Sequence, residues 1–447
     1  MRNTLLAVSL LFAAAFNAAS FPSGSPSTTN NDDSCDIALL PAATLLLPYF
    51  EVDVSAPQTV ARTTLFTIVN TSQVPQIARV TIWSDLGYPV VNFNLFLTGY
   101  DVQALNLYDV LARFIIAPPA GTSSTTVPGS RSLPNNANPN FAATASAECE
   151  INPGPFPAPI GNDIRNALTI GRISTCGNAM IGTTHANAIG YATIDVVKTC
   201  SLTFPDSEAY YDDLLYDNVL TGDYQTINPN SATGNYAAGN PLVHIRAIPE
   251  GGAAGAPTPV TNLPYTFYDR YTPRATPAKD RRQPLPSAFS ARFIQGGSGA
   301  FNTNYQIWRE GITGGNAACA DYAKNVGTSM TFTDVVRFDE HENPAVLNPC
   351  PILILCTPVV PVLPESSSVA TSASVFPVMP GSDVGGWMYL NLNNSDARAR
   401  PSQNWVAVTM FAEGRFSVAF DATMLANGCT PAPAAGATIG PGPNTVP

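Results

Sequence analysis

The segment TTLFTIVNTSQVPQIARVTIWSDLGYPVVNFNLFL, residues 63–97, contains three strand-like stretches separated by turn-forming residues. Two of them, Thr63–Asn70 and Arg79–Ser84, are rich in the β-branched and aromatic residues that favour pleated strands. The third, Val91–Leu97, alternates apolar residues with two asparagines, which predicts a half-buried strand whose asparagines lie opposite the core. Three strands so close together in the sequence predict an antiparallel sheet that packs in a sandwich.

The same pattern continues along the chain. Further strand-like stretches are Gly190–Val197, Leu242–Ile248, Tyr305–Glu310, Met330–Phe338, Trp387–Asn393, Trp405–Ala412 and Arg415–Phe420. Helical spacing predicts a short helix at Leu107–Phe114, and a helical turn is expected at Asp206–Tyr216. The 41 prolines and 32 glycines disfavour long helices. The expected fold is mainly β, with two antiparallel β-sandwich-like modules, long Pro/Gly-rich loops and a few short helices.

The N-terminus has the three parts of an export signal. Arg2 supplies a basic start, Thr4–Phe16 is apolar, and Ala18-Ala19-Ser20 offers small residues for cleavage. The apolar run is shorter than the roughly 20 residues that a membrane-spanning helix needs, and no later stretch is long and apolar enough to span a bilayer. We therefore expect a secreted protein, extracellular or in the periplasm or at the cell surface, with no transmembrane segment in the mature chain.

Composition divides the chain into six parts. They are a signal peptide (1–20), a disordered linker (21–34), an N-terminal β-sandwich-like module (35–117), a loop-rich linker or excursion (118–162), a C-terminal mainly-β module (163–429) and a disordered tail (430–447). The linkers and the tail are predicted from their high content of Pro, Gly, Ser, Thr and Asn.

The cysteines fit an oxidising compartment. The eight are Cys35, Cys149, Cys176, Cys200, Cys319, Cys350, Cys356 and Cys429. Their number is even and no pair has C-x-x-C spacing, so we expect all of them in disulfides rather than in a zinc or redox site. Four lie in each half of the chain, which weakly favours bridges within each half.

Charge and motif content narrow the function. The chain has 32 acidic residues against 21 basic ones, an excess that disfavours nucleic acid and anionic membranes as partners. Nucleotide-binding, zincin and nucleophile-elbow motifs are missing, and three histidines make a multi-histidine metal site hard to assemble. We expect no metal and no cofactor. Catalytic residues stay unassigned, and a triad assembled from distant segments stays open because geometry defines it.

The stretch RFDEHEN, residues 337–343, concentrates charged groups after a strand-like run. Asp339 and His341 could form a carboxylate–histidine pair for acid–base or metal chemistry. The alternative is a solvated strand end that stops at Asn343-Pro344, and we favour it because polar clusters beside proline are usually turns.

An arginine- and tyrosine-rich stretch, YDRYTPRATPAKDRRQPLPS at residues 268–287, is the candidate ligand site. The proposed ligand-binding residues are Tyr268, Arg270, Tyr271, Arg274, Arg281 and Arg282. Arginine binds carboxylate or sulfate and tyrosine packs on sugars, so the partner would be an acidic glycan or another envelope component. The alternative is a loop whose arginines pair with the protein's own acids, among them Asp280 and the stretch Asp206–Asp223.

Several phrases resemble a group of bacterial exported β-rich proteins that has no assigned activity. They are TLFTIVNTSQVPQIARVTIWSD (64–85), GYATIDVVKTC (190–200), GNPLVHIRA (239–247) and DRRQPLPSAFSARFIQGG (280–297). The resemblance implies an exported β-protein and transfers no catalytic residue. We expect an exported, disulfide-stabilised extracellular or cell-envelope protein with a structural or binding role, and we favour a non-catalytic protein over an enzyme. The alternative is a glycan-active lyase or hydrolase that uses Arg270, Tyr268, Tyr271 and His244.

Overall fold

A computed structural model describes most of the chain between residues 37 and 425. The described residues are 37–116, 157–229, 236–247, 266–267, 280–297, 300–311, 319–326, 330–332, 334–346, 361–378, 384–393, 402–412 and 416–425. The predicted signal peptide (1–20), linker (21–34) and tail (430–447) lie outside them.

The first module consists of two antiparallel sheets. Its strands are β1 (Thr44–Val52), β2 (Thr63–Asn70), β3 (Gln76–Ser84), β4 (Pro89–Leu97), β5 (Val102–Asn106), β6 (Ala188–Val197), β7 (Leu220–Asn228), β8 (Tyr236–Pro241) and β9 (Val243–Ile245). One sheet has the order β4-β3-β6-β1-β9 and the other β5-β2-β7-β8. Apolar side chains from both sheets form one core cluster between them, to which helices α2 (Leu107–Ala112) and α4 (Ala158–Thr169) also contribute.

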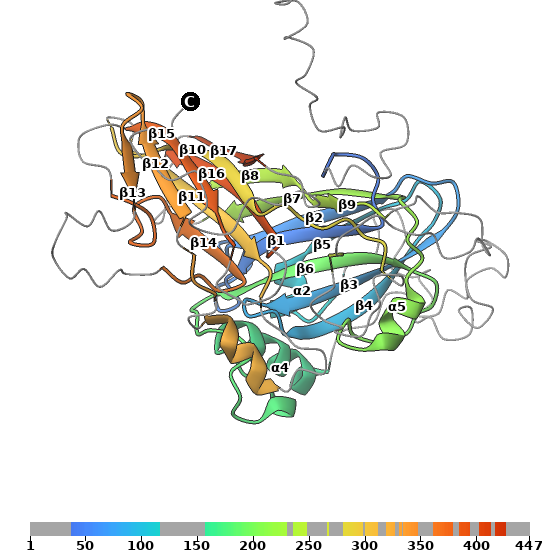
Figure 1. Cartoon of the computed structure of the whole chain (residues 1–447). Helices are drawn as coiled ribbons and strands as arrows, with labels where there is room; N and C mark the ends of the chain where they lie inside the picture. The colour runs from blue at the N-terminus through green and yellow to red at the C-terminus, as the bar shows by residue number, and fades with distance from the viewer. Residues whose placement is uncertain are drawn as a thin grey trace, which may run out of the picture.

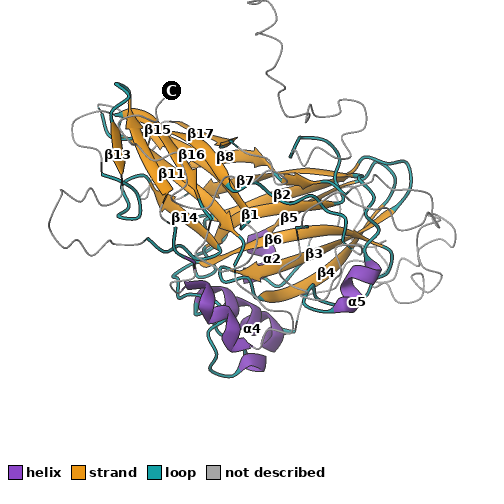
Figure 2. Ribbon diagram, viewed as in Figure 1, coloured by secondary structure: helices purple, strands orange, loops and turns teal. Residues whose placement is uncertain are grey.

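The second module also consists of two antiparallel sheets. Its strands are β10 (Ala288–Ile294), β11 (Phe301–Arg309), β12 (Asp334–Asp339), β13 (Pro344–Val346), β14 (Ser366–Ala370), β15 (Gly385–Asn391), β16 (Asn404–Ala412), β17 (Phe416–Asp421) and β18 (Thr423–Met424). Their orders are β13-β12-β15-β10-β18 and β14-β11-β16-β17. The remaining described helices are α5 (Glu208–Asp213) and the 3₁₀ helices η1 (Ser174–Cys176) and η3 (Cys319–Val326). Helices α4 and α5 lie at the periphery of the layered strands (Figure 2). The expected fold class, mainly β with two sandwich-like modules, is confirmed.

The boundary between the modules differs from the sequence prediction. Strand β6 lies between β3 and β1, and β7 pairs with β2 along its whole length. The first module therefore continues to β9, and the expected end at residue 117 falls inside it (Figure 1). The segment 118–162 was expected to be a linker or an excursion; its described end, residues 157–162, forms the start of α4. Pairing between distant strands leaves no local composition signal, which is why the boundary was misplaced.

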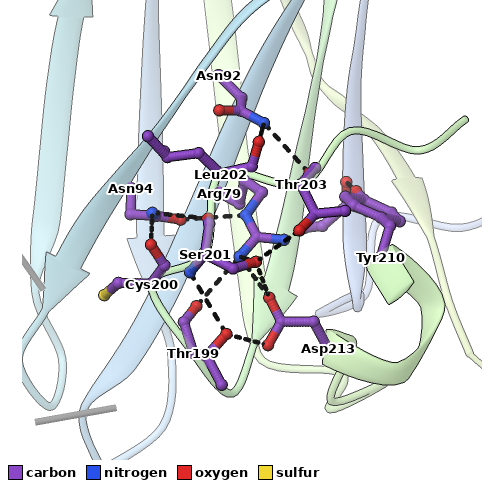
Figure 3. A network of polar contacts seen from close by, with 11 residues as sticks. Arg79, Asn92, Asn94, Thr199, Cys200, Ser201, Leu202, Thr203, Tyr210 and Asp213 are labelled. Atoms are coloured by element: carbon purple, nitrogen blue, oxygen red, sulfur yellow. Dashed lines mark hydrogen bonds and ion pairs between the residues drawn. The ribbon is translucent and has the colours of Figure 1, made fainter. Parts of the chain in front are cut away.

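Strand β4 was expected to be half-buried, and it is buried on both faces. Asn92 and Asn94 lie under the segment that follows β6 and donate hydrogen bonds to its carbonyls. The amide of Asn92 reaches Leu202 O at 3.1 Å and that of Asn94 reaches Cys200 O at 3.0 Å. Figure 3 shows this segment folded over the strands, with Arg79 beneath it and paired with Asp213. The asparagines that alternate along β4 therefore face the covering segment, to which they donate hydrogen bonds, and do not face solvent.

Aromatic packing and a disulfide join the two modules. Tyr191 on β6 stacks on Trp83 at 5.5 Å between ring centroids and meets the edge of Trp308 on β11 at 6.0 Å. The Cys176–Cys319 disulfide links η1 to η3, 143 residues apart. This bridge crosses between the halves of the chain, so the expectation of bridges within halves is wrong for this pair.

The described helices include none whose length and apolar character would suit a membrane crossing.

Candidate functional site

A cleft with a volume of about 170 Å³ lies where the outer face of one second-module sheet meets the first module. We call it the seam cleft; its lining residues are Tyr49, Glu51, Arg62, Thr226, Tyr236, Asn304, Gln306, Ser368, Thr409 and Phe411. They come from strands β1, β7, β8, β11, β14 and β16 and from the approach to β2. Figure 1 shows β8 beside β16 and β17, where the layers of the two modules meet.

Strand alternation explains which second-module residues face the cleft. On β11, Tyr305 and Ile307 are fully buried in the core, so Asn304 and Gln306 point to the opposite face. Ser368 on β14 lies opposite Gln306 in the strand pairing, so it faces the same side of the sheet. The outer face of this sheet is therefore polar although the first module covers part of it.

The first module contributes an ion pair to the seam cleft. Arg62 Nη1 lies 2.5 Å from Glu51 Oε1, and the two side chains are 25% and 15% exposed. Glu51 also accepts hydrogen bonds from the Tyr49 hydroxyl at 3.2 Å and from the Asn187 amide at 2.6 Å. Burial, the largest single influence, lowers the pKa of Arg62, but the Glu51 carboxylate together with Tyr236 and Tyr49 raises it above its ordinary value. The two charges are thus held together and compensate each other.

Tyr49 is a neutral hydrogen-bond donor at this site. Burial, and after it the neighbouring Glu51 carboxylate, raises the pKa of the Tyr49 phenol well above its ordinary value. The phenol therefore keeps its proton at any physiological pH and donates it to Glu51.

Two aromatic rings from different modules form one wall of the cleft. Tyr236 on β8 and Phe411 on β16 stack with 5.2 Å between ring centroids and an interplanar angle of 17°. Nearby, the Tyr224 hydroxyl donates to Gln306 Oε1 at 3.1 Å and fixes the orientation of that amide. Within the described residues, the buried Thr226 Oγ1 has no hydrogen-bond partner. An unpaired hydroxyl of this kind is costly unless a ligand or water satisfies it.

The arrangement suits binding better than hydrolysis of a sugar chain. Glycosidases use two carboxyl groups on opposite sides of the scissile bond. Glu51 is the only carboxylate among the described residues that line the cleft, and three groups already hydrogen-bond to it.

Four of the six ligand-binding residues predicted from the sequence, Tyr268, Arg270, Tyr271 and Arg274, lie outside the described residues. The other two, Arg281 and Arg282, lie in the described segment that precedes β10.

Arg282 is an interior residue. Its side chain is 1% exposed and forms ion pairs with Asp195 at 2.7 Å and with Asp280 at 2.8 Å. Arg281 lies over the Tyr216 ring, 5.1 Å from its centroid. At Arg282 the geometry agrees with the alternative in which arginines pair with the protein's own acids. Asp280 was among those acids; Asp195 was not.

The RFDEHEN stretch forms a turn at the end of β12. Asp339 accepts hydrogen bonds from the backbone N–H groups of His341 and Asn343, both at 2.8 Å. The His341 and Asn343 side chains are exposed. The described residues contain no group of three or more His, Cys, Asp or Glu that would hold a metal ion. A capped turn explains why charged residues gather here.

The contacts of His185 and His244 do not have the arrangement of a catalytic triad. Asp85 Oδ2 and Thr183 Oγ1 both contact Nε2 of His185, at 2.9 and 2.6 Å. A catalytic triad requires the carboxylate and the hydroxyl on different ring nitrogens. His244 is buried in β9 and contacts the Leu40 carbonyl through Nδ1 at 2.8 Å.

No protein-family model, curated protein or solved structure matches the chain.

Proposed function

We propose that the chain is an exported, disulfide-stabilised protein of the extracellular space or cell envelope with a binding role, and that the seam cleft is its ligand site. The observation that carries the proposal is a cleft lined by polar and aromatic side chains from both modules. Concave sites with an aromatic surface and a few polar groups are where proteins bind small ligands.

Export is supported by the signal-like N-terminus and by the cysteines. Cys176 and Cys319 form a disulfide, and Cys200 is also disulfide-bonded. None of the described cysteines has a free thiol. Disulfides persist in oxidising compartments, so this chemistry fits a location outside the cytoplasm.

The glycan-active enzyme considered from the sequence has no specific observation in its favour. Three of its residues, Tyr268, Arg270 and Tyr271, lie outside the described residues, and His244 is buried in β9 and does not line the cleft.

A localisation experiment tests the export part. The full chain and a version that starts at Phe21, both with a C-terminal tag, are produced in a bacterial host and fractionated. We expect the full chain outside the cytoplasm with its leader removed, and the version without the leader in the cytoplasm. A full-length chain that stays uncleaved in the cytoplasm would contradict the proposal.

A binding screen tests the role of the cleft. The oxidised protein without its leader is screened against cell-wall fractions, neutral and acidic glycans, and peptides. The Tyr236→Ala variant alters the cleft wall, and Gln225→Ala is the matched control because Gln225 is exposed on the opposite face of the adjacent strand β7. We expect a ligand whose binding is weakened in Tyr236→Ala and unchanged in Gln225→Ala. No ligand at all, or binding that both variants retain, would refute the assignment of the cleft.

A further inference from the structure

We infer that the seam cleft takes a single uncharged sugar residue, free or as one unit of an extracellular glycan. This inference rests on the binding role proposed above and specifies its ligand class. It departs from the acidic glycan that the arginine-rich stretch favoured, because the cleft has a different charge balance.

Charge is the first argument. Glu51 and Arg62 are the only charged residues among the described residues that line the cleft, and they form an ion pair with each other. An anionic ligand would have to compete with Glu51 for Arg62, and a cationic ligand would have to compete with Arg62 for Glu51. An uncharged ligand disturbs neither partner and leaves the partly buried pair intact.

The aromatic wall is the second argument. The C–H groups on one face of a pyranose ring pack against aromatic rings, and tyrosine combines an apolar face with a polar hydroxyl. Tyr236 and Phe411 lie nearly parallel at 5.2 Å and both line the cleft. A sugar thus finds an apolar surface on one side of the cleft.

The polar groups are the third argument. Thr226 Oγ1, Asn304 and Thr409 carry hydroxyl or amide groups that both donate and accept hydrogen bonds. Sugar hydroxyls have the same dual character and match such a lining. The Thr226 hydroxyl is buried and has no partner among the described residues, so it is a further polar group in this lining.

Size limits the ligand to one ring. The cleft volume of about 170 Å³ is well below the roughly 300–1,000 Å³ of pockets for drug-sized molecules. A chain of sugars would therefore place one unit in the cleft and leave its neighbours outside.

The experiment is a calorimetric titration of the oxidised protein without its leader. The probes are the methyl glycosides of glucose, galactose and mannose, N-acetylglucosamine, and glucuronic acid as the acidic comparison. We expect at least one uncharged sugar to bind, with an affinity that changes less than about twofold between low and high salt, because no net charge is attracted. Tyr236→Ala should weaken binding about tenfold, whereas Tyr236→Phe should keep most of it.

Two further variants secure the interpretation. Asn304→Ala removes a cleft amide without touching the aromatic wall, and it should also weaken binding if the sugar lies in the cleft. Gln225→Ala should bind like the wild type. Melting temperatures are recorded for every variant so that a loss of binding is separated from a loss of folding.

The outcomes separate the two proposals. Binding of glucuronic acid alone, or of a peptide, with Tyr236→Ala defective, refutes the uncharged sugar and keeps the binding role. Sugar binding that persists unchanged in Tyr236→Ala and Asn304→Ala refutes the sugar site at this cleft. No binding of any probe or of any screened fraction refutes both.

Discussion

Replacing Arg282 should destabilise the protein strongly, whereas its neighbour Arg281 should tolerate the same change. The Arg282 guanidinium is 1% exposed and compensates the buried Asp195 and Asp280 carboxylates at 2.7 and 2.8 Å. Arg282→Ala leaves two carboxylates in the interior without their cation. Removal of one member of a buried ion pair typically costs about 3–5 kcal/mol, and we expect a loss in the free energy of unfolding of at least that size.

Arg281→Ala is the matched control. Arg281 lies 5.1 Å from the centroid of the Tyr216 ring, a cation–π contact of about 0.5–1 kcal/mol. Urea unfolding of both variants and the wild type, all oxidised and followed by tryptophan fluorescence, measures the difference. The reasoning is wrong if Arg282→Ala lies within about 1 kcal/mol of the wild type, or if both variants lose equal stability.

Three further predictions concern pH, the disulfide and a glycine. Burial raises the pKa of Asp421 to about 6, whereas the unfolded chain releases this proton near pH 4. Between these pH values the folded protein therefore binds one more proton at Asp421 than the unfolded chain does. The contribution of Asp421 to the free energy of unfolding thus falls as pH rises from about 4 to about 6. Asp421→Asn should flatten that slope in urea titrations across this range, and an unchanged slope contradicts the prediction. The double variant Cys176→Ser/Cys319→Ser removes a disulfide between residues 143 apart in the sequence and should lower the free energy of unfolding by about 2–5 kcal/mol. The loss should appear as a lower melting temperature under non-reducing conditions, and equal melting temperatures would disprove it. Gly87 has φ +82° and a side chain there would collide with the Glu365 carboxylate, so Gly87→Ala should lose about 1–3 kcal/mol in urea unfolding, and a neutral result would rule out the strain.

The sequence predicted a strand correctly where apolar and polar residues alternate along it. Thr63–Asn70 forms β2 with the predicted bounds, because buried and half-exposed residues alternate along it. Strand β1, TLLLPYFEV, was missed because it is buried almost throughout and contains a proline, so no alternation marks it. Helix α4 was missed because proline and glycine at its start resemble loop composition.

Arg282 illustrates a second limit of sequence reasoning. Its neighbours in the chain are charged residues and prolines, which is the composition of an exposed loop. Its partner Asp195 lies on β6, 87 residues away, and only the three-dimensional structure brings them together.

The seam cleft lies beyond local sequence signals for the same reason. Its residues span positions 49 to 411; nine come from six strands of both modules, and Arg62 precedes β2. Each, taken alone, is an ordinary polar, charged or aromatic residue of a strand or a strand approach. The only sequence clue was the polar alternation of Asn304 and Gln306 on β11, and that pattern is equally typical of a strand that faces solvent.

The position of β6 has a consequence for biogenesis. Strands β1 and β3 cannot complete their sheet until residues 188–197 have emerged, and the intervening chain must close a long loop before any of these hydrogen bonds form. Such non-local pairing slows folding and leaves unpaired strand edges exposed in the meantime. Until then the chain presents an aggregation-prone intermediate, and a chaperone that covers strand edges should raise its yield.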